Sequence, residues 1–74
     1  MNKFGEFIRN QRFKNGWTAA QLASKIGITS VQLSNIEKGK CLPRIGSVEK
    51  YAKALDLNLA DLTDVWIEDY ESRK

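Results

Sequence analysis

The sequence predicts an all-α fold, and three features of its 74 residues point to that class. Apolar residues recur three or four positions apart in successive stretches, which is the spacing of an amphipathic helix. Three of those stretches are preceded by a residue that favours helix N-termini, and glycine follows several of them. The connectors between them are short. We therefore expect five helices and no strands.

The first expected helix covers residues 2–14. Its apolar contacts are Phe4, Phe7 and Ile8. Asn15-Gly16 ends the helix, because glycine readily takes the left-handed conformation found after helix C-termini. Trp17 follows, and we expect its large side chain to plug the core.

The second and third expected helices each begin with a threonine that has a glutamine three positions later. In such a capping box the threonine side chain accepts a hydrogen bond from the third residue, and the glutamine returns one to the threonine N–H. The two pairs are Thr18 with Gln21 and Thr29 with Gln32. The glycines that end the two helices are Gly27 and Gly39.

The fourth expected helix covers residues 45–55 and follows the loop 40–43. Its apolar face consists of Val48, Tyr51, Ala52 and Leu55. Asn58 is expected to cap the fifth helix, with Asp61 as its box partner. The apolar stripe of that helix consists of Leu59, Leu62, Val65, Trp66 and Tyr70.

Length and composition indicate one small soluble domain over residues 1–74, in which residues 65–74 form a C-terminal extension. A chain this short buries only about 60% of its unfolded surface, so dimerisation is a common remedy. No apolar run approaches the roughly 20 residues of a membrane span, and the N-terminus lacks an apolar signal core. The single cysteine, Cys41, fits a reducing compartment. We therefore expect a cytoplasmic protein.

The residue types present exclude most site chemistry. With no histidine and one cysteine, the chain cannot build a structural zinc site or a nucleophile pair that uses histidine. No glycine loop that would cradle phosphates is present, and no paired carboxylates suggest an enzyme. We expect no enzymatic activity, no metal and no cofactor.

Charge is divided unevenly along the chain. Residues 1–53 hold ten basic and three acidic residues, a net charge of +7, whereas residues 54–74 hold two basic and six acidic residues, a net charge of −4. A basic body suits a polyanionic partner such as nucleic acid, although small proteins also carry excess lysine for solubility. Charge alone leaves both interpretations open.

Residues 19–38 carry the pattern of a helix-turn-helix. Two short helices meet through the turn Gly27-Ile28-Thr29, where glycine can adopt the positive φ that a tight turn needs. Ala23 must be small because the second helix of the pair presses on it. The aliphatic positions that lock the two helices together are Leu22, Ile26, Ile28, Leu33 and Ile36. Each position is weak evidence alone, but together they predict this motif.

The chain resembles the phage-repressor or Cro-like family of transcriptional regulators, also called the XRE family. The resemblance covers roughly residues 4–64, and the matching segments are Ile8-Arg9, Arg12, Gly16-Trp17-Thr18, Gln21-Leu22-Ala23, Ile26-Gly27-Ile28-Thr29, residues 33–40, Pro43 and residues 51–55. It implies a lambda-repressor-like five-helix domain whose third helix enters the DNA major groove, usually as a dimer on a palindromic operator. Ala19, Gln11 and Arg44 depart from the family pattern, and the family often has a DNA-contacting glutamine where Ala19 stands.

The third helix should present one face to DNA. At about 100° per residue, Leu33 and Ile36 cluster on the side opposite the polar residues. The candidates for base contacts are Ser30, Val31, Gln32, Ser34 and Asn35. Asn35 and Gln32 could pair with an adenine edge, and Val31 could pack on a thymine methyl group. A harmless surface valine is an equally good interpretation of Val31.

Phosphates should be held by helix N-termini and by cations. The candidates are Thr18 and Thr29 at the two N-termini, together with Arg9, Arg12, Lys38, Lys40 and Arg44. The resemblance also places Arg12 and Glu37 as a partly buried pair that ties the first helix to the end of the third. Two solvated charges that never meet are the alternative.

Trp66 and Tyr70 lie beyond the part that closes a minimal core, and aromatic residues there suggest an interface. The alternative is that Trp66 folds back on the core, against Phe4 or Phe13.

The leading hypothesis is a homodimeric repressor that binds double-stranded DNA. The other is an antitoxin or similar protein-binding module whose C-terminal helix binds a partner, with DNA binding as autoregulation.

Overall fold

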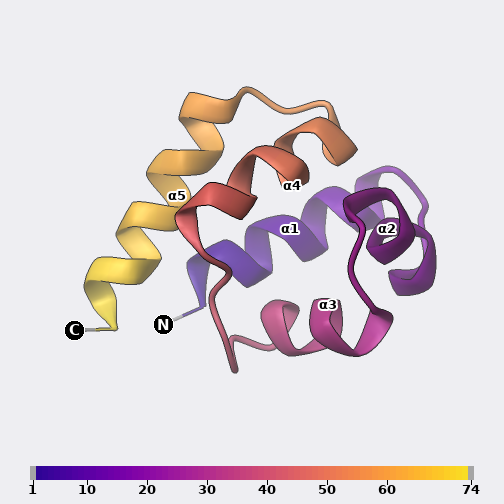
Figure 1. Cartoon of the computed structure of the whole chain (residues 1–74), viewed down its shortest axis with the longest axis horizontal. Coiled ribbons are helices and arrows are strands. Elements are labelled where there is room, and N and C mark those ends of the chain that lie inside the picture. Colours follow the sequence, from indigo (N-terminus) through magenta and orange to yellow (C-terminus); the bar gives the residue numbers. More distant parts are fainter. Residues whose placement is uncertain (1, 74) are drawn as a thin grey trace.

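A computed structural model describes residues 2–73, and it contains five α-helices and a short 3₁₀ turn in that range (Figure 1). The elements are α1 (Lys3–Lys14), α2 (Ala19–Ile26), α3 (Ser30–Glu37), η1 (Ile45–Ser47), α4 (Val48–Leu55) and α5 (Leu59–Ser72). The described part contains no strand, so the all-α prediction is confirmed. None of these helices is long and apolar enough to cross a membrane. Met1 and Lys74, which the expected domain of residues 1–74 includes, lie outside the described residues.

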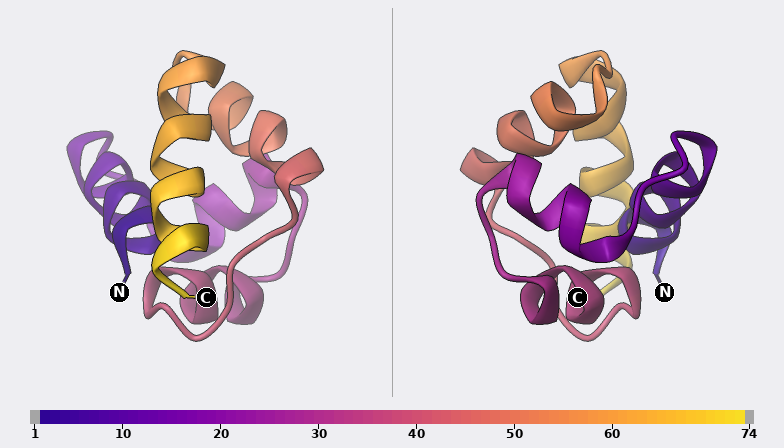
Figure 2. Two further views of the ribbon diagram at one scale, coloured as in Figure 1. Left: turned by 90° about the vertical axis from the view of Figure 1, so that its left-hand side faces the viewer. Right: turned by 90° about the vertical axis from the view of Figure 1, so that its right-hand side faces the viewer.

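The helices enclose one core, and α3 lies at one edge of the bundle. α2 packs on α3 and α4, whereas α1 packs on α3 and α5. Figures 1 and 2 show α3 at the bottom of the bundle, below α4. The core residues are Phe4, Ile8, Leu22, Ala23, Ile26, Leu33, Ile36, Val48, Tyr51, Ala52, Leu55 and Leu62. Because α3 contacts the bundle along one side only, its other side is left to solvent.

Both expected capping boxes form, so the starts of α2 and α3 are set by local sequence. The Thr18 hydroxyl accepts from the Gln21 N–H at 3.1 Å, and Gln21 Oε1 accepts from the Thr18 N–H at 2.8 Å. The corresponding distances for Thr29 and Gln32 are 3.1 and 2.9 Å. Gly27 closes α2 with a φ of 93°, which a residue with a Cβ rarely adopts.

The expected start of the fourth helix was wrong, and so was the box partner at the start of the fifth. Residues 45–47 form a 3₁₀ turn, and α4 begins only at Val48, since Arg44 supplies no side-chain bond to cap a helix there. Asn58 also does not share a box with Asp61. Its own Oδ1 accepts from the N–H groups of Ala60 and Asp61, at 2.9 and 3.3 Å, so the short side chain caps α5 by itself.

Trp17 is only half-buried and packs against the edge of the core, so it does not plug the interior as expected. The Lys25 ammonium lies 4.8 Å from the centre of its ring, a cation–π contact. Tyr51 is the large aromatic residue that fills the interior, with its ring edge against Phe4 at 5.6 Å between centroids. Burial raises the pKa of Tyr51 to about 12, so its hydroxyl is neutral at physiological pH.

Gly5 sets how closely α1 approaches the C-terminal end of α3. A Cβ at this position would collide with the Ile36 carbonyl oxygen and with Asn2 Oδ1, and it would lie 3.0 Å from the Glu37 carbonyl oxygen. The backbone of α1 therefore passes directly against the last turn of α3. Only a residue without a side chain fits that crossing.

Gly5→Ala should therefore destabilise the protein, although alanine is the better helix former by about 1 kcal/mol. Overpacking of this kind costs about 1–3 kcal/mol, and the neighbours here include rigid backbone carbonyl groups. The free energy of unfolding in urea measures the effect. The matched control is Gly46→Ala, where a Cβ meets nothing within 4 Å. A Gly5→Ala protein as stable as this control would mean that the helices are not in close contact.

Candidate nucleic-acid interface

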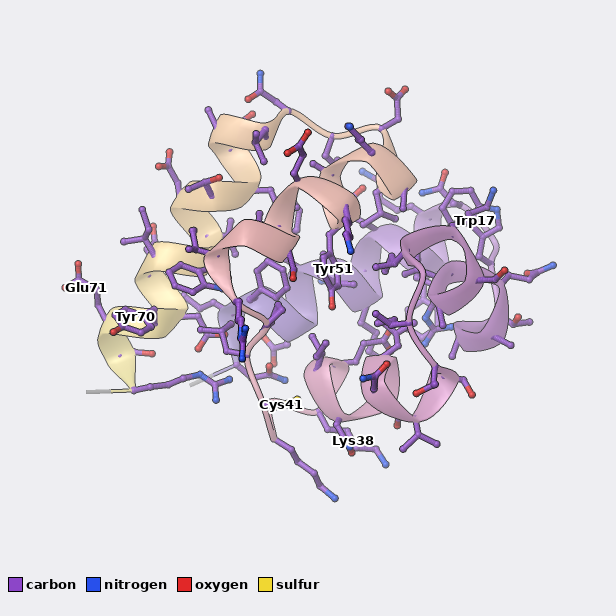
Figure 3. All side chains as sticks on the ribbon, in the orientation of Figure 1. Trp17, Lys38, Cys41, Tyr51, Tyr70 and Glu71 are labelled. Carbon is purple, nitrogen blue, oxygen red and sulfur yellow. The ribbon has the colours of Figure 1, made fainter. Side chains whose placement is uncertain are left out.

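The exposed side of α3 carries all five residues that the sequence suggested for base contacts. Leu33 and Ile36 are buried on the opposite side, and Val31 is 68% exposed. Ser30 and Gln32 are exposed, whereas Ser34 and Asn35 are partly exposed. Figure 3 shows Lys38 on the side of α3 that faces away from the bundle. The polar residues of α3 thus form one accessible surface.

Gln32 has less freedom on this surface than the sequence suggested. Its Oε1 already accepts a hydrogen bond from the Thr29 N–H at 2.9 Å. A bidentate pair with adenine needs both the oxygen and the nitrogen of a glutamine amide. With the capping box closed, the Gln32 amide oxygen is turned toward the Thr29 N–H, so Asn35 is the better candidate for such a pair.

A cleft of about 230 Å³ lies beside this surface, where α1, α2 and α3 meet. Its lining residues are Arg9, Arg12, Ala19, Ser34, Glu37 and Lys38. Ala19 is the first residue of α2, so the positive end of that helix dipole faces the cleft. Three cations against one carboxylate, together with a helix N-terminus, suit an anion such as a phosphate. The small side chain of Ala19 leaves the entrance open.

Arg12 and Glu37 form the ion pair that closes the inner wall of this cleft. Arg12 Nε and a terminal guanidinium nitrogen each lie 2.9 Å from one oxygen of Glu37, and the other terminal nitrogen donates to the Trp17 carbonyl at 3.1 Å. The side chains are only 13% and 7% exposed. The hydrogen bonds with Glu37 raise the pKa of Arg12 above its ordinary value. Two of the five guanidinium donors remain for another acceptor.

Phe13 contacts two of the cations that line the cleft, a role that the sequence analysis missed. Its exposed ring has the Arg9 and Arg12 guanidinium groups at 5.2 and 4.7 Å from its centre. Such cation–π contacts hold a guanidinium in place at modest cost in entropy. The four-residue spacing between Arg9 and Phe13 on one helix is the signal that could have indicated this contact.

The remaining phosphate candidates lie outside the cleft. Thr18 and Thr29 cap the N-termini of α2 and α3, and Lys40 is exposed in the loop after α3. Arg44 lies farther along that loop and lines a different groove, of about 480 Å³. The other residues of this second groove are Leu42, Pro43, Trp66, Tyr70 and Arg73. The structure therefore separates Arg44 from the other cations.

Trp66 is half-buried and belongs to the wall of the second groove. Its indole Nε1 donates to the Pro43 carbonyl at 2.7 Å, and its ring stacks on Tyr70 with 5.0 Å between centroids. Trp66 thus folds back on its own chain, where it packs against the core and binds the loop at Pro43. Tyr70 remains 47% exposed. An exposed aromatic ring beside a groove is a feature of protein interfaces.

Comparison with known proteins agrees with this geometry. The helix-turn-helix family profile matches residues 8–62, a range that includes all of α2, α3 and α4. The chain is also 34% identical over 67 residues to the cryptic phage CTXphi transcriptional repressor RstR of Vibrio cholerae serotype O1. That match covers 90% of this chain and 60% of the relative, so the chain spans about 60% of the length of that protein.

Arg12→Ala should lower the free energy of unfolding by about 3 kcal/mol, because it leaves the Glu37 carboxylate buried without its partner. Thermal denaturation measures the loss. Lys53→Ala is the control, since its pair with Glu49 is exposed and such pairs contribute less than about 1 kcal/mol. Equal melting temperatures for the two variants would show that the Arg12 pair is not a structural tie.

Proposed function

The chain belongs to the helix-turn-helix family, and on that premise we propose that it is a homodimeric transcriptional repressor that reads a palindromic operator in double-stranded DNA. The observation that carries the proposal is the exposed polar side of α3 beside a cleft lined by three cations. A transcriptional repressor among the similar proteins supports the same function. A cytoplasmic location is part of this proposal.

In this proposal the exposed side of α3 reads the bases. The N-terminal part of a recognition helix faces base edges in the major groove. Asn35 pairs with an adenine edge, and Val31 packs on a thymine methyl group, which gives its exposed apolar side chain a partner. Ser30 and Ser34 accept several bases, and Gln32 contributes through its free NH₂ group.

The cleft and the helix N-termini hold the sugar-phosphate backbone. Arg12 has two donors left after its bonds to Glu37 and Trp17, and Arg9 and Lys38 stand beside it. Thr18 and Thr29 bring the N-termini of α2 and α3 close to phosphates, and Lys40 contacts the backbone beyond α3. Such contacts supply affinity without sequence preference.

A second copy binds through α5 in this proposal. Tyr70 and Ile67 are exposed on neighbouring turns of α5, and the groove at Trp66 lies next to them. Trp66 contributes the face of its ring, because its N–H is bonded to Pro43. Two-fold pairing would then place two α3 helices about 34 Å apart, one turn of DNA.

The same groove supports a second candidate function. Arg44 and Arg73 flank the stacked rings of Trp66 and Tyr70, a combination that suits an acidic segment of a partner protein. The chain would then be an antitoxin or a similar binding module that uses DNA for autoregulation. The oligomeric state of the isolated protein separates the two functions.

Asn35→Ala should weaken the operator complex about 5- to 100-fold and relax preference at one base pair per half-site, since one bidentate base contact discriminates by about 1–3 kcal/mol. Affinity for scrambled DNA should barely change, because it comes from phosphates. Titration against operator and scrambled duplexes measures both effects. The operator itself comes from selection in a random DNA pool.

Lys40→Ala is the matched control for this test. It should weaken all sequences equally and reduce the salt dependence of binding by about one unit per subunit. If Asn35→Ala loses the same affinity for operator and scrambled DNA, α3 does not read bases and the assignments above are wrong.

Tyr70→Glu should lower the dimer fraction, because it puts a charge into the proposed apolar contact. Sedimentation of the free protein and of its complex with operator DNA measures the stoichiometry, with two chains per palindrome expected for the unmodified protein. Asp64→Glu on the exposed side of α5 is the control. A one-to-one complex on a non-palindromic site would remove the homodimer and favour the second candidate function.

A further inference from the structure

Asp69 is fully buried near the end of α5, and the proposed DNA interface does not use it. Its Oδ2 accepts a hydrogen bond from the Phe4 N–H at 3.1 Å, and its Oδ1 accepts one from Arg73 Nε at 3.0 Å. Asp69, Phe4 and Arg73 all lie outside residues 8–62, which match the helix-turn-helix family. The family match therefore does not account for this buried contact between the first helix and the last.

The bond to Phe4 is a helix cap supplied from a distant part of the chain. The first N–H groups of a helix have no acceptor inside it, and the residue before the helix usually supplies one from its side chain. Asn2 stands at that position of α1, and asparagine is among the preferred capping residues. Its side chain nevertheless makes no capping bond to α1. The carboxylate of Asp69 accepts from the first turn instead.

The side chain of Asn2 caps the recognition helix instead of its own helix. Asn2 Nδ2 donates to the carbonyl oxygen of Glu37, the last residue of α3, at 2.8 Å. The final carbonyl groups of a helix lack donor partners inside it, just as the first N–H groups lack acceptors. A Cβ on Gly39 would lie 2.7 Å from Asn2 Cγ, so the amide is wedged against the turn after α3. Asn2 Oδ1, the atom that would normally cap α1, is buried and has no hydrogen-bond partner among the described residues.

We propose that Asp69 is a positioning residue for DNA recognition, because it caps α1 and thereby leaves Asn2 to hold the C-terminal end of α3. Only the consequence for DNA binding rests on the proposed function; the effect on the end of α3 does not. Without the carboxylate, Asn2 Oδ1 becomes the nearest acceptor for the first turn of α1. Rotation of Asn2 toward that turn breaks its bond to Glu37, and the end of the recognition helix loosens.

The ion pair between Lys3 and Glu68 joins the same two helices but does not explain this arrangement. Its side chains are 45% and 61% exposed, and water and salt screen a pair of that kind. Its hydrogen bond joins the Lys3 ammonium to the Glu68 carboxylate and involves neither the Asn2 amide nor the Glu37 carbonyl. Lys3→Ala therefore removes a link between α1 and α5 without disturbing the two caps, and it serves as a control.

Amide hydrogen exchange of the free protein tests the positioning step without DNA. Asp69→Ala should speed exchange about tenfold at Lys38, Gly39 and Lys40, whose N–H groups bond to carbonyl groups of α3. Gly27 and Ile28, bonded to the Ala23 carbonyl, should keep their rates. Asp64→Ala, which removes an exposed acid from the same helix, is the charge-matched control. Lys3→Ala is the second control. A uniform increase at all amides, or none after α3, overturns the proposal.

A double-mutant cycle on operator affinity tests the consequence for DNA. Asp69→Ala and Asn2→Ala should each weaken operator binding about tenfold, and the double variant should be no weaker than the weaker single variant, because both remove the same restraint. Affinities that fall by the product of the two factors would mean independent structural roles and overturn the proposal. Measurement well below both melting temperatures keeps unfolding out of the result.

Asp69→Asn covers the case in which Asp69→Ala does not fold. Its amide oxygen can still accept from Phe4, so exchange at Lys38–Lys40 should stay at the rate of the unmodified protein; a tenfold increase there overturns the proposal. If the unmodified protein shows no operator preference, the proposed function fails. The exchange experiment still decides whether Asp69 controls the end of α3.

Discussion

Glu37 is the residue through which α1 holds α3, the second helix of the helix-turn-helix. Arg12 binds its carboxylate, Asn2 binds its carbonyl oxygen, and the absence of a side chain at Gly5 lets the two helices come this close. A helix of eight residues is marginal by itself, because the cost of its first turn is spread over few hydrogen bonds. The position of α3 therefore depends on restraints from outside it, at its C-terminal end above all.

These restraints explain why the exposed side of α3 can be so polar. Leu33 and Ile36 supply its burial from one side, while the Thr29 box and the contacts at Glu37 fix its two ends. The outer side of α3 therefore needs no apolar residue for stability, and its residues are free to serve binding. The cleft beside α3 and the second groove at Trp66 are also separate surfaces, lined by different residues.

Patterns within a few residues were predictable from the sequence. The boxes at Thr18 and Thr29 have a fixed three-residue spacing, and the buried faces of the helices follow the helical period. The pair between Arg12 and Glu37 came from resemblance to a family, since nothing in a spacing of 25 positions indicates it. The 3₁₀ turn at residues 45–47 was not predicted, because its only signal in the sequence is the absence of a capping side chain at Arg44.

Contacts between distant residues were beyond reach of the sequence. Asp69 is one of six acidic residues in a stretch that reads as a solvated helix face, and only the packing of α5 on α1 buries it. The bond from Trp66 to Pro43 likewise depends on the path of a loop that has no regular pattern. Local sequence thus decides where helices lie along the chain, and tertiary packing decides which polar groups meet.

The contact between Phe4 and Asp69 also fixes an order of events during synthesis. The two residues are 65 positions apart in the sequence, and the bond between them closes a loop that contains α2, α3 and α4 and most of α1 and α5. A growing chain on the ribosome can form α2 and α3 early, but Asp69 cannot bind the first turn of α1 until residue 69 has emerged. This contact is therefore acquired late, and a nascent chain interrupted before that point carries the helix-turn-helix without it.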